Sequence, residues 1–290
     1  MTKPAVLGVA LLLAGATADY RAEVERWRFE REARLRAEDG WLSVVGLFWL
    51  QPGESSFGSG PGSRILLPKG APERAGVFER RGREVSVKIE PGVAASVGDK
   101  PVTSMTLRSD ASGAADILRL GPLSLSVIER GGDIGVRLKD NDSPQRKEWK
   151  GLSWFPVDEA YRVTARFVAG PPGATLEITN VLGQTNALPS PGEAVFELGG
   201  REVRLTPVLE EPDATELFFI FRDETAARET YGAGRFLYAA LPRDGAVVLD
   251  FNKAYSPPCA FTRFATCPLP PKRNRLPLRI EAGEKFAGHD

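Results

Sequence analysis

The sequence predicts a mainly β protein, an antiparallel barrel or sandwich with one helix near its N-terminus. Three observations support this: short hydrophobic runs that alternate with polar residues, a single stretch with helical periodicity, and frequent turn residues, with 30 Gly and 23 Pro among 290 residues. The hydrophobic fraction of 42% is ordinary for a globular chain and is enough to form a sizeable core.

Residues 1–18 have the pattern of a secretory signal peptide. Lys3 supplies a short positive region, an apolar run follows over residues 5–15, and Ala16-Thr17-Ala18 has the small-x-small pattern of a cleavage site. A membrane anchor is the alternative, but it needs roughly 20 apolar residues, and charged residues interrupt this run earlier. We therefore expect a periplasmic or secreted protein with no membrane span after cleavage.

Residues 19–39 form the one predicted helix. Asp19 is expected to cap its start, and Gly40 to end it. Its charged residues, among them the i,i+4 pair of Glu30 and Arg34, are expected to face solvent. The apolar residues predicted to share one face are Tyr20, Val24, Trp27 and Leu35.

Ten short segments beyond this helix have the composition and alternation of β-strands, and no regular helices separate them, which favours a sandwich or barrel. They are residues 41–50, 83–89, 123–129, 133–139, 161–168, 175–179, 201–209, 216–221, 235–240 and 246–250.

An internal repeat is also predicted. Residues 77–85 and 195–203 are identical at seven of nine positions, and each reads as a β-hairpin around a glycine turn. Weaker correspondences follow in the same order, and they define pseudo-repeats over about residues 74–168 and 192–281. Two halves this intertwined would share one core, so we predict a single β-rich domain over residues 19–290.

Six sequence motifs stand out along the mature chain. They are DGWLSVVGLFWL at 39–50, FRDET at 221–225, ETYGAGRF at 229–236, DFNKAYSPPCA at 250–260, CPLPP at 267–271 and NRL at 274–276. Together they resemble a bacterial family known only as domain of unknown function 1684, and the resemblance implies no particular reaction. The residue expected from the family pattern at Ser256 is asparagine, which weakens any role for that side chain.

Composition excludes several kinds of site. His289 is the only histidine, which makes a Ser-His-Asp triad or a histidine metal site improbable, and we predict neither metal nor cofactor. Lys and Arg together number 38, as do Asp and Glu, so no basic excess points to nucleic acid. Cys259 and Cys267, in an exported protein, predict one structural disulfide.

Polar residues at predicted strand ends are the candidates for a functional site. We expect a pocket in which arginine side chains bind a small anionic or polyol ligand while amide and phenol groups orient it. The predicted ligand-binding residues are Arg137, Arg222, Tyr231, Arg235, Asn252 and Tyr255.

Two alternatives to ligand binding stay open. Asp140 and Asp250 end corresponding strands of the two predicted repeats, and together they could serve a hydrolase of a glycan or ester, because a carboxylate pair can supply an acid and a base or nucleophile. Alternatively, the charges could pair with one another in a structural envelope module without a pocket. The sequence leaves the oligomeric state open.

Overall fold

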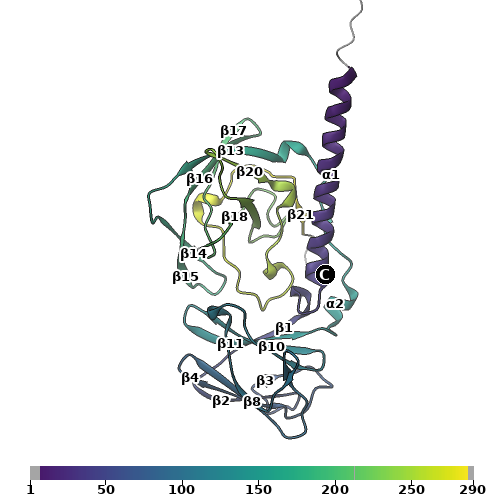
Figure 1. The fold of residues 1–290 in the computed structure, drawn as a ribbon, viewed down its shortest axis with the longest axis vertical. Coiled ribbons are helices and arrows are strands. Elements are labelled where there is room, and N and C mark those ends of the chain that lie inside the picture. The colour runs from purple at the N-terminus through teal and green to yellow at the C-terminus, as the bar shows by residue number, and fades with distance from the viewer. Residues whose placement is uncertain (1–6, 212, 287–290) are drawn as a thin grey trace, which may run out of the picture. The chain divides into compact units, whose positions relative to one another are not determined.

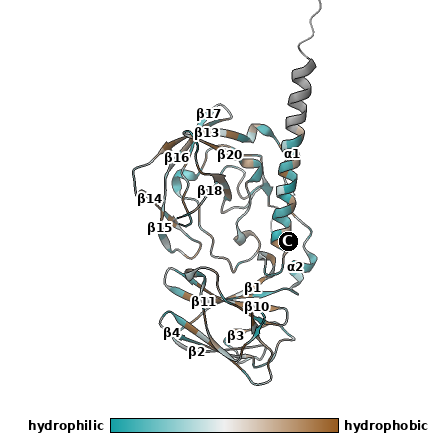
Figure 2. Cartoon of the chain, in the orientation of Figure 1, coloured by the Kyte–Doolittle hydropathy of each residue, from teal (hydrophilic) through white to brown (hydrophobic). Residues whose placement is uncertain are grey.

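The computed structural model describes residues 7–211 and 213–286 and confirms a mainly β protein with one long N-terminal helix and largely antiparallel sheets (Figure 1). Every one of the ten predicted strand segments contains a strand. Hydrophobic residues concentrate in the strands, whereas the part of the long helix beyond its grey section is mainly hydrophilic (Figure 2).

Contacts within the chain divide it into two compact units. Unit 1 comprises Met1–Arg34, Gly151–Ala260 and Cys267–Asp290, and unit 2 comprises Leu35–Lys150 and Phe261–Thr266. The chain therefore passes between the units four times. These boundaries do not coincide with the predicted repeat halves, and the single domain over residues 19–290 stays a prediction.

Unit 2 contains two sheets that share one hydrophobic core. The rings of Phe57 and Phe78 lie 4.7 Å apart within this core, which also contains Leu125 and Val136 from the other sheet. The first sheet has the order β1 (Val44–Trp49), β11 (Asp133–Asp140), β10 (Leu123–Arg130), β9 (Ile117–Leu120), β6 (Ser96–Val97), β7 (Lys100–Pro101). The second has the order β3 (Ile65–Leu66), β2 (Gly53–Gly58), β4 (Gly76–Arg81), β5 (Glu84–Ile89), β8 (Ser104–Leu107). A short helix, α2 (Pro144–Glu148), follows the strands, and Ser143 caps it.

Unit 1 is built around a second core, to which Phe196, Phe219, Phe221 and Phe251 contribute. Within the described residues its strands form open sheets and no closed barrel. The four-stranded sheet has the order β17 (Arg201–Leu205), β16 (Gly192–Leu198), β13 (Arg162–Ala169), β20 (Ala246–Asp250). The two-stranded sheets pair β14 (Thr175–Thr179) with β15 (Thr185–Pro189), β18 (Glu216–Phe221) with β19 (Arg235–Ala240), and β12 (Ser153–Trp154) with β21 (Glu284–Lys285).

Both predicted hairpins form, one from β4 and β5 and the other from β16 and β17. Their turns use glycines at positive φ, Gly82 at 63° and Gly199 at 61°, a conformation that glycine adopts without a Cβ clash. The duplication that would relate the two hairpins stays a prediction.

The helix α1 (Leu7–Arg36) begins before its predicted start and ends three residues before its predicted end at residue 39. It does not begin at Asp19, because the preceding leucines and alanines are strong helix formers and continue the helix toward the N-terminus. The first six residues of the predicted signal peptide lie outside the described part of the chain, as does His289. No helix in the described residues is long and apolar enough to cross a membrane.

One face of α1 is buried as predicted, but two of its charged residues are buried with it. Tyr20 and Val24 are 6% and 0% exposed, as expected for the apolar face. Arg28 and Arg31 are only 7% and 8% exposed, so the prediction that the helix charges face solvent was wrong for these two. Arg28 pairs with Glu25 on the same helix, Nη1 to Oε1 over 3.1 Å, and also donates to the distant carbonyl of Phe155 over 2.9 Å.

Candidate functional site

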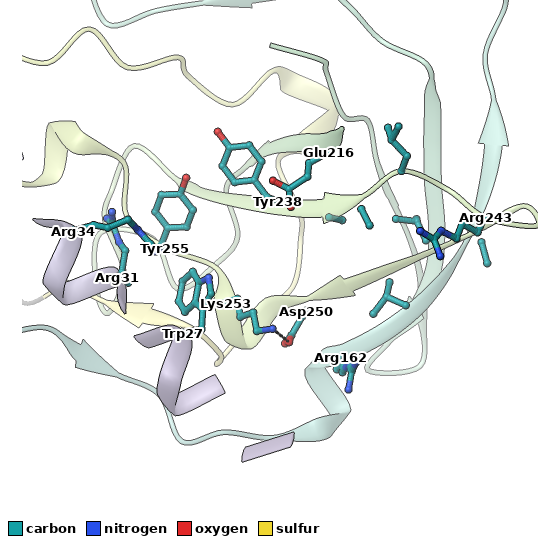
Figure 3. A pocket seen from close by; sticks show the side chains of 16 residues that line it. Trp27, Arg31, Arg34, Arg162, Glu216, Tyr238, Arg243, Asp250, Lys253 and Tyr255 are labelled. Atoms are coloured by element: carbon teal, nitrogen blue, oxygen red, sulfur yellow. Dashed lines mark ion pairs between the residues drawn. The ribbon is translucent and has the colours of Figure 1, made fainter. Parts of the chain in front are cut away.

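Unit 1 contains a cavity of about 820 Å³ between α1 and the hairpin region of β18 to β20 (Figure 3). A volume of this size is within the range of small-molecule sites. Its charged and aromatic lining residues are Trp27, Arg31, Arg34, Arg162, Glu216, Tyr238, Arg243, Asp250, Lys253 and Tyr255. Small and aliphatic side chains complete the wall: Ala239, Ala240, Leu241, Ala246, Val247 and Val248.

Three aromatic rings form a continuous row along this cavity. The ring centres of Trp27 and Tyr255 are 6.2 Å apart, and those of Tyr255 and Tyr238 are 6.4 Å apart with an interplanar angle of 14°. Figure 3 shows the two tyrosines side by side, with Trp27 next to Tyr255. Such a row offers stacking surface to a flat or ring-shaped ligand.

The local fold explains why these tyrosines face the cavity. Side chains alternate along β19, so Leu237 and Ala239 enter the core while Tyr238 is 37% exposed. Tyr255 follows β20 and exchanges two backbone hydrogen bonds with Phe236 of β19, at 2.8 and 3.0 Å. Strand register therefore places the two phenols together.

Both phenols remain protonated at neutral pH. Burial raises the pKa of Tyr255 to about 12, with the nearby Arg31 acting in the opposite direction. Burial also raises the pKa of Tyr238, whose hydroxyl donates to a carboxylate oxygen of Glu210 over 2.6 Å. The two hydroxyls are therefore uncharged and add no negative charge to the cavity.

Arg31 is held firmly at the cavity wall. Its Nη2 donates to the carbonyl of Ser256 over 2.9 Å, and its Nε lies 3.4 Å from Oε2 of Glu284. Its guanidinium carbon is 4.5 Å from the centre of the Tyr255 ring, a cation–π distance. These contacts fix the guanidinium plane against the aromatic row.

Glu284, on β21, is the buried carboxylate behind this arginine. Its side chain is 0% exposed, and burial raises the pKa of its carboxyl, while Arg31 and Ser256 act in the opposite direction. The other oxygen, Oε1, has no hydrogen-bond partner among the described residues. A Cβ on the preceding Gly283 would stand 2.3 Å from the carbonyl oxygen of Ala254, so only glycine permits this close approach.

The other cations of the cavity are more exposed. Arg34 lies 3.8 Å from Glu30, an exposed i,i+4 pair that the sequence predicted. Arg162 stacks over the Tyr20 ring at 4.8 Å. Within the described part of the chain, neither Arg162 nor Arg243 has a carboxylate within ion-pair distance.

Asp250 lies at the end of β20, within a hydrogen-bond network that joins α1 to the sheet. The hydroxyl of Tyr20 donates to Oδ1 of Asp250 over 2.8 Å, and Nζ of Lys253 is 3.6 Å from Oδ2. Asn252 is 0% exposed; its Nδ2 donates to the Tyr20 hydroxyl and to the carbonyl of Asp158, at 2.9 and 2.7 Å. Asn252 thus braces the network and does not line the cavity.

The structure distributes the predicted site residues of unit 1 over several environments. Asp250 and Tyr255 line the cavity. Arg235 is 1% exposed and forms a buried ion pair with Asp223, Nη2 to Oδ1, over 3.1 Å. Arg222 donates from Nε to the carbonyl of Gly232 over 2.9 Å.

Tyr231, the remaining predicted residue of unit 1, also makes an internal contact. Its hydroxyl donates to the carbonyl of Cys259 over 3.2 Å, and its ring meets Phe286 edge-on at 5.1 Å. Arg222, Arg235 and Tyr231 therefore serve internal contacts of unit 1.

Two predicted site residues belong to unit 2. Arg137, on β11, is 8% exposed, and its guanidinium carbon lies 5.1 Å from the centre of the Trp41 ring. Asp140 ends the same strand and accepts a 2.8 Å hydrogen bond from the backbone N–H of Asp142. Neither unit by itself contains both Asp140 and Asp250.

The predicted disulfide is not formed, which corrects that prediction. Cys259 and Cys267 both carry thiols in this structure. The residues are close, but they meet backbone to sulfur: the N–H of Cys259 donates to Sγ of Cys267 over 3.1 Å. No group of three or more His, Cys, Asp or Glu in the described residues could hold a metal ion.

Sequence reasoning missed several residues of the cavity. Trp27, Arg31 and Arg34 were assigned to a helix that only packs on a sheet, and Tyr238 and Arg243 were not considered. The available signal was their spacing, because Trp27, Arg31 and Arg34 recur at helical intervals of four and three and therefore share one face.

Residues 147–285 match the family described as "Protein of unknown function (DUF1684)". An uncharacterized protein of Haloarcula marismortui, solved by NMR, is 31% identical, with coverage of 49% of this chain and 80% of that one and a TM-score of 0.42. No curated protein matches the chain.

Structures of FHA domains are also similar to part of the chain. One, from work on phosphothreonine-dependent FHA interactions, is 17% identical and covers 32% of this chain and 92% of that one. Another, the FhaA FHA domain in complex with the intracellular domain of Rv3910, is 17% identical and covers 32% and 97%. Both have TM-scores of 0.23. By the match over residues 147–285, the chain belongs to the DUF1684 family.

Proposed function

We propose that this protein binds a small organic anion with a flat or ring-shaped body in the cavity of unit 1. The observation that carries the proposal is the lining, in which five cationic side chains face two carboxylates around about 820 Å³. Cations in excess favour a ligand of opposite charge. Guanidinium groups in particular suit carboxylate, sulfonate or phosphate oxygens, because they offer forked donors.

The aromatic row supplies the second element of recognition. Trp27, Tyr255 and Tyr238 present adjoining rings, and Val248 and Leu241, 46% and 42% exposed, add apolar surface to the cavity lining. A ligand with a ring and one acidic group would use both features. A neutral polyol could stack on the rings but would supply no negative charge to Arg162 and Arg243, the two lining cations that lack a carboxylate within ion-pair distance in the described residues.

Hydrolysis by a carboxylate pair receives less support. Asp250 already accepts from Tyr20 and pairs with Lys253, and its intended partner Asp140 belongs to unit 2. Binding without chemistry is therefore the function we propose. The predicted signal peptide would place this binding in the periplasm or outside the cell, and export remains part of the proposal.

Matched ligand pairs test the proposal directly. Benzenesulfonate and glucuronate should each raise the melting temperature, whereas their neutral counterparts benzenesulfonamide and glucose should not. A ligand at 100 times its Kd stabilises the folded state by about 2.7 kcal/mol, which corresponds to a shift of several degrees. If neither anion shifts the melting temperature, or the neutral partners shift it equally, the proposal is overturned.

A charge variant and its matched control localise the site. Arg34→Gln, in the cavity, should weaken benzenesulfonate binding in calorimetry, because the guanidinium contributes to the local positive potential. Arg228→Gln changes an exposed arginine that lies outside the cavity lining and should leave the Kd unchanged. Equal effects of the two variants would place the binding elsewhere.

A further inference from the structure

The cavity arginine Arg31 lies between the cavity and a carboxylate that solvent does not reach. On one side it lines the cavity and stacks on Tyr255 at 4.5 Å. On the other side its Nε lies 3.4 Å from Oε2 of Glu284, whose side chain is 0% exposed. An anion in the cavity and the Glu284 carboxylate would therefore compete for the same guanidinium.

The surroundings of Glu284 favour its neutral form. Burial raises the pKa of its carboxyl, and Oε1 has no hydrogen-bond partner among the described residues. Hydrogen bonding from Ser256 lowers the pKa of this carboxyl and so opposes the effect of burial, which is the larger of the two. A protonated Glu284 has an O–H to donate, whereas an ionised one has none.

Few other charged or titratable groups act on Glu284. Arg235, on β19, interacts with it through space but is committed to Asp223 at 3.1 Å. Tyr255 stays neutral, since its pKa is raised to about 12. Trp154, the strand partner of Glu284 on β12, carries no charge. Arg31 is thus the cation in direct contact with this carboxylate.

We infer that Glu284 is a positioning residue that takes up a proton when an anion binds in the cavity. Arg31 then has the bound anion as its counterion in place of the Glu284 carboxylate. The inference rests on the proposed anion binding. An anion near Arg31 repels the Glu284 carboxylate and draws on its counterion, and both effects favour protonation. By linkage, the factor by which a bound anion raises the proton affinity of Glu284 is also the factor by which protonation of Glu284 raises the anion affinity.

Proton uptake is measurable on the unmodified protein. Benzenesulfonate is a suitable probe because its charge does not change with pH. Its binding enthalpy should differ between two cationic buffers of different ionisation enthalpy, such as Bis-Tris and Tris, by an amount that indicates protons taken up. Affinity should fall as pH rises through the raised folded pKa of Glu284. Binding without proton uptake overturns the inference and leaves anion binding intact, whereas no binding at any pH overturns both.

Glu284→Gln identifies the responsible group. The amide cannot ionise, so the variant should show no proton uptake and a pH-independent Kd, with affinity at the upper pH about tenfold tighter than the wild type. Glu281→Gln, an exposed carboxylate three positions away, should behave like the wild type. If Glu284→Gln keeps the proton uptake of the wild type, another group titrates and the inference is wrong. If the variant does not fold, the buffer experiment on the wild type decides.

Discussion

The hydroxyl of Tyr20 donates a 2.8 Å hydrogen bond to Asp250, a residue 230 positions later in the chain. This bond fixes α1 against the end of β20, and the same helix supplies Trp27, Arg31 and Arg34 to the cavity. The geometry of the candidate site therefore depends on contacts between the two ends of the sequence.

Tyr20→Phe should test this attachment. It removes the donor to a carboxylate and should lower the free energy of unfolding by about 1.5–3 kcal/mol, the range for hydrogen bonds to charged groups. Urea denaturation measures the change. Tyr161→Phe is a suitable control because no hydrogen bond of that hydroxyl is found in the described residues, and it should be nearly neutral.

Arg235→Met should destabilise the protein strongly without changing ligand binding in the cavity. The change leaves Asp223 buried with an uncompensated charge, which typically costs about 3–5 kcal/mol. Urea denaturation should show this loss, and calorimetry under native conditions should show an unchanged Kd for benzenesulfonate. A marked loss of affinity in folded protein would instead return Arg235 to the binding site, where the sequence had placed it.

Glu284 should also affect stability as a function of pH. Because burial raises its folded pKa above the ordinary value of 4.5, the folded state binds the proton more tightly than the unfolded state. Its contribution is therefore most favourable below pH 4.5 and is lost as pH rises through the folded pKa. The difference in unfolding free energy between wild type and Glu284→Gln should change with pH in this direction, and a constant difference would contradict it.

Tyr238→Ala should weaken binding of benzenesulfonate, because it removes the end of the aromatic row. A stacked pair contributes about 0.5–1.5 kcal/mol, so the Kd should rise severalfold in calorimetry. Tyr238→Phe keeps the ring and loses the contacts of the hydroxyl with Glu210 and Tyr255, and its Kd should stay close to the wild type. Equal losses in both variants would mean that the hydroxyl, and not the ring, contacts the ligand.

The two cysteines should titrate as thiols. Denatured, unreduced protein should react with two equivalents of a thiol reagent, since no S–S bond joins Cys259 and Cys267. If no thiol reacts, the protein contains the disulfide that the sequence predicts. The predicted stabilisation of such a bridge, about 2–3 kcal/mol by the chain-entropy model, would then appear as a loss of stability on reduction.

Strand positions were predictable because each strand buries alternate residues. In β5, Val85, Val87 and Ile89 are 1%, 1% and 5% exposed, as their alternation predicts. Positions 41–43 were wrongly included in the first strand; they form a short 3-10 helix that ends where β1 begins. Local patterns thus located the strands but left their ends uncertain by a few residues.

The candidate site was less predictable, because tertiary partners decide which charges are buried. Arg31 looks like an exposed helix residue until Glu284, 253 positions away, is placed beside it. Arg235 looks like a ligand donor until Asp223 neutralises it inside the core. Two predicted site residues, Asp250 and Tyr255, do line the cavity, because one ends β20 and the other follows it, where side chains leave the core. Their predicted roles stay predictions.

The division of the chain has a practical consequence for dissecting it. Because unit 1 is assembled from three stretches and unit 2 from two, no single cleavage point releases either one whole. A gene fragment limited to the family match, residues 147–285, would lack Trp27, Arg31 and Arg34 and with them one wall of the cavity. Deletion studies would therefore report on a broken site, and point substitutions are the appropriate instrument for this protein.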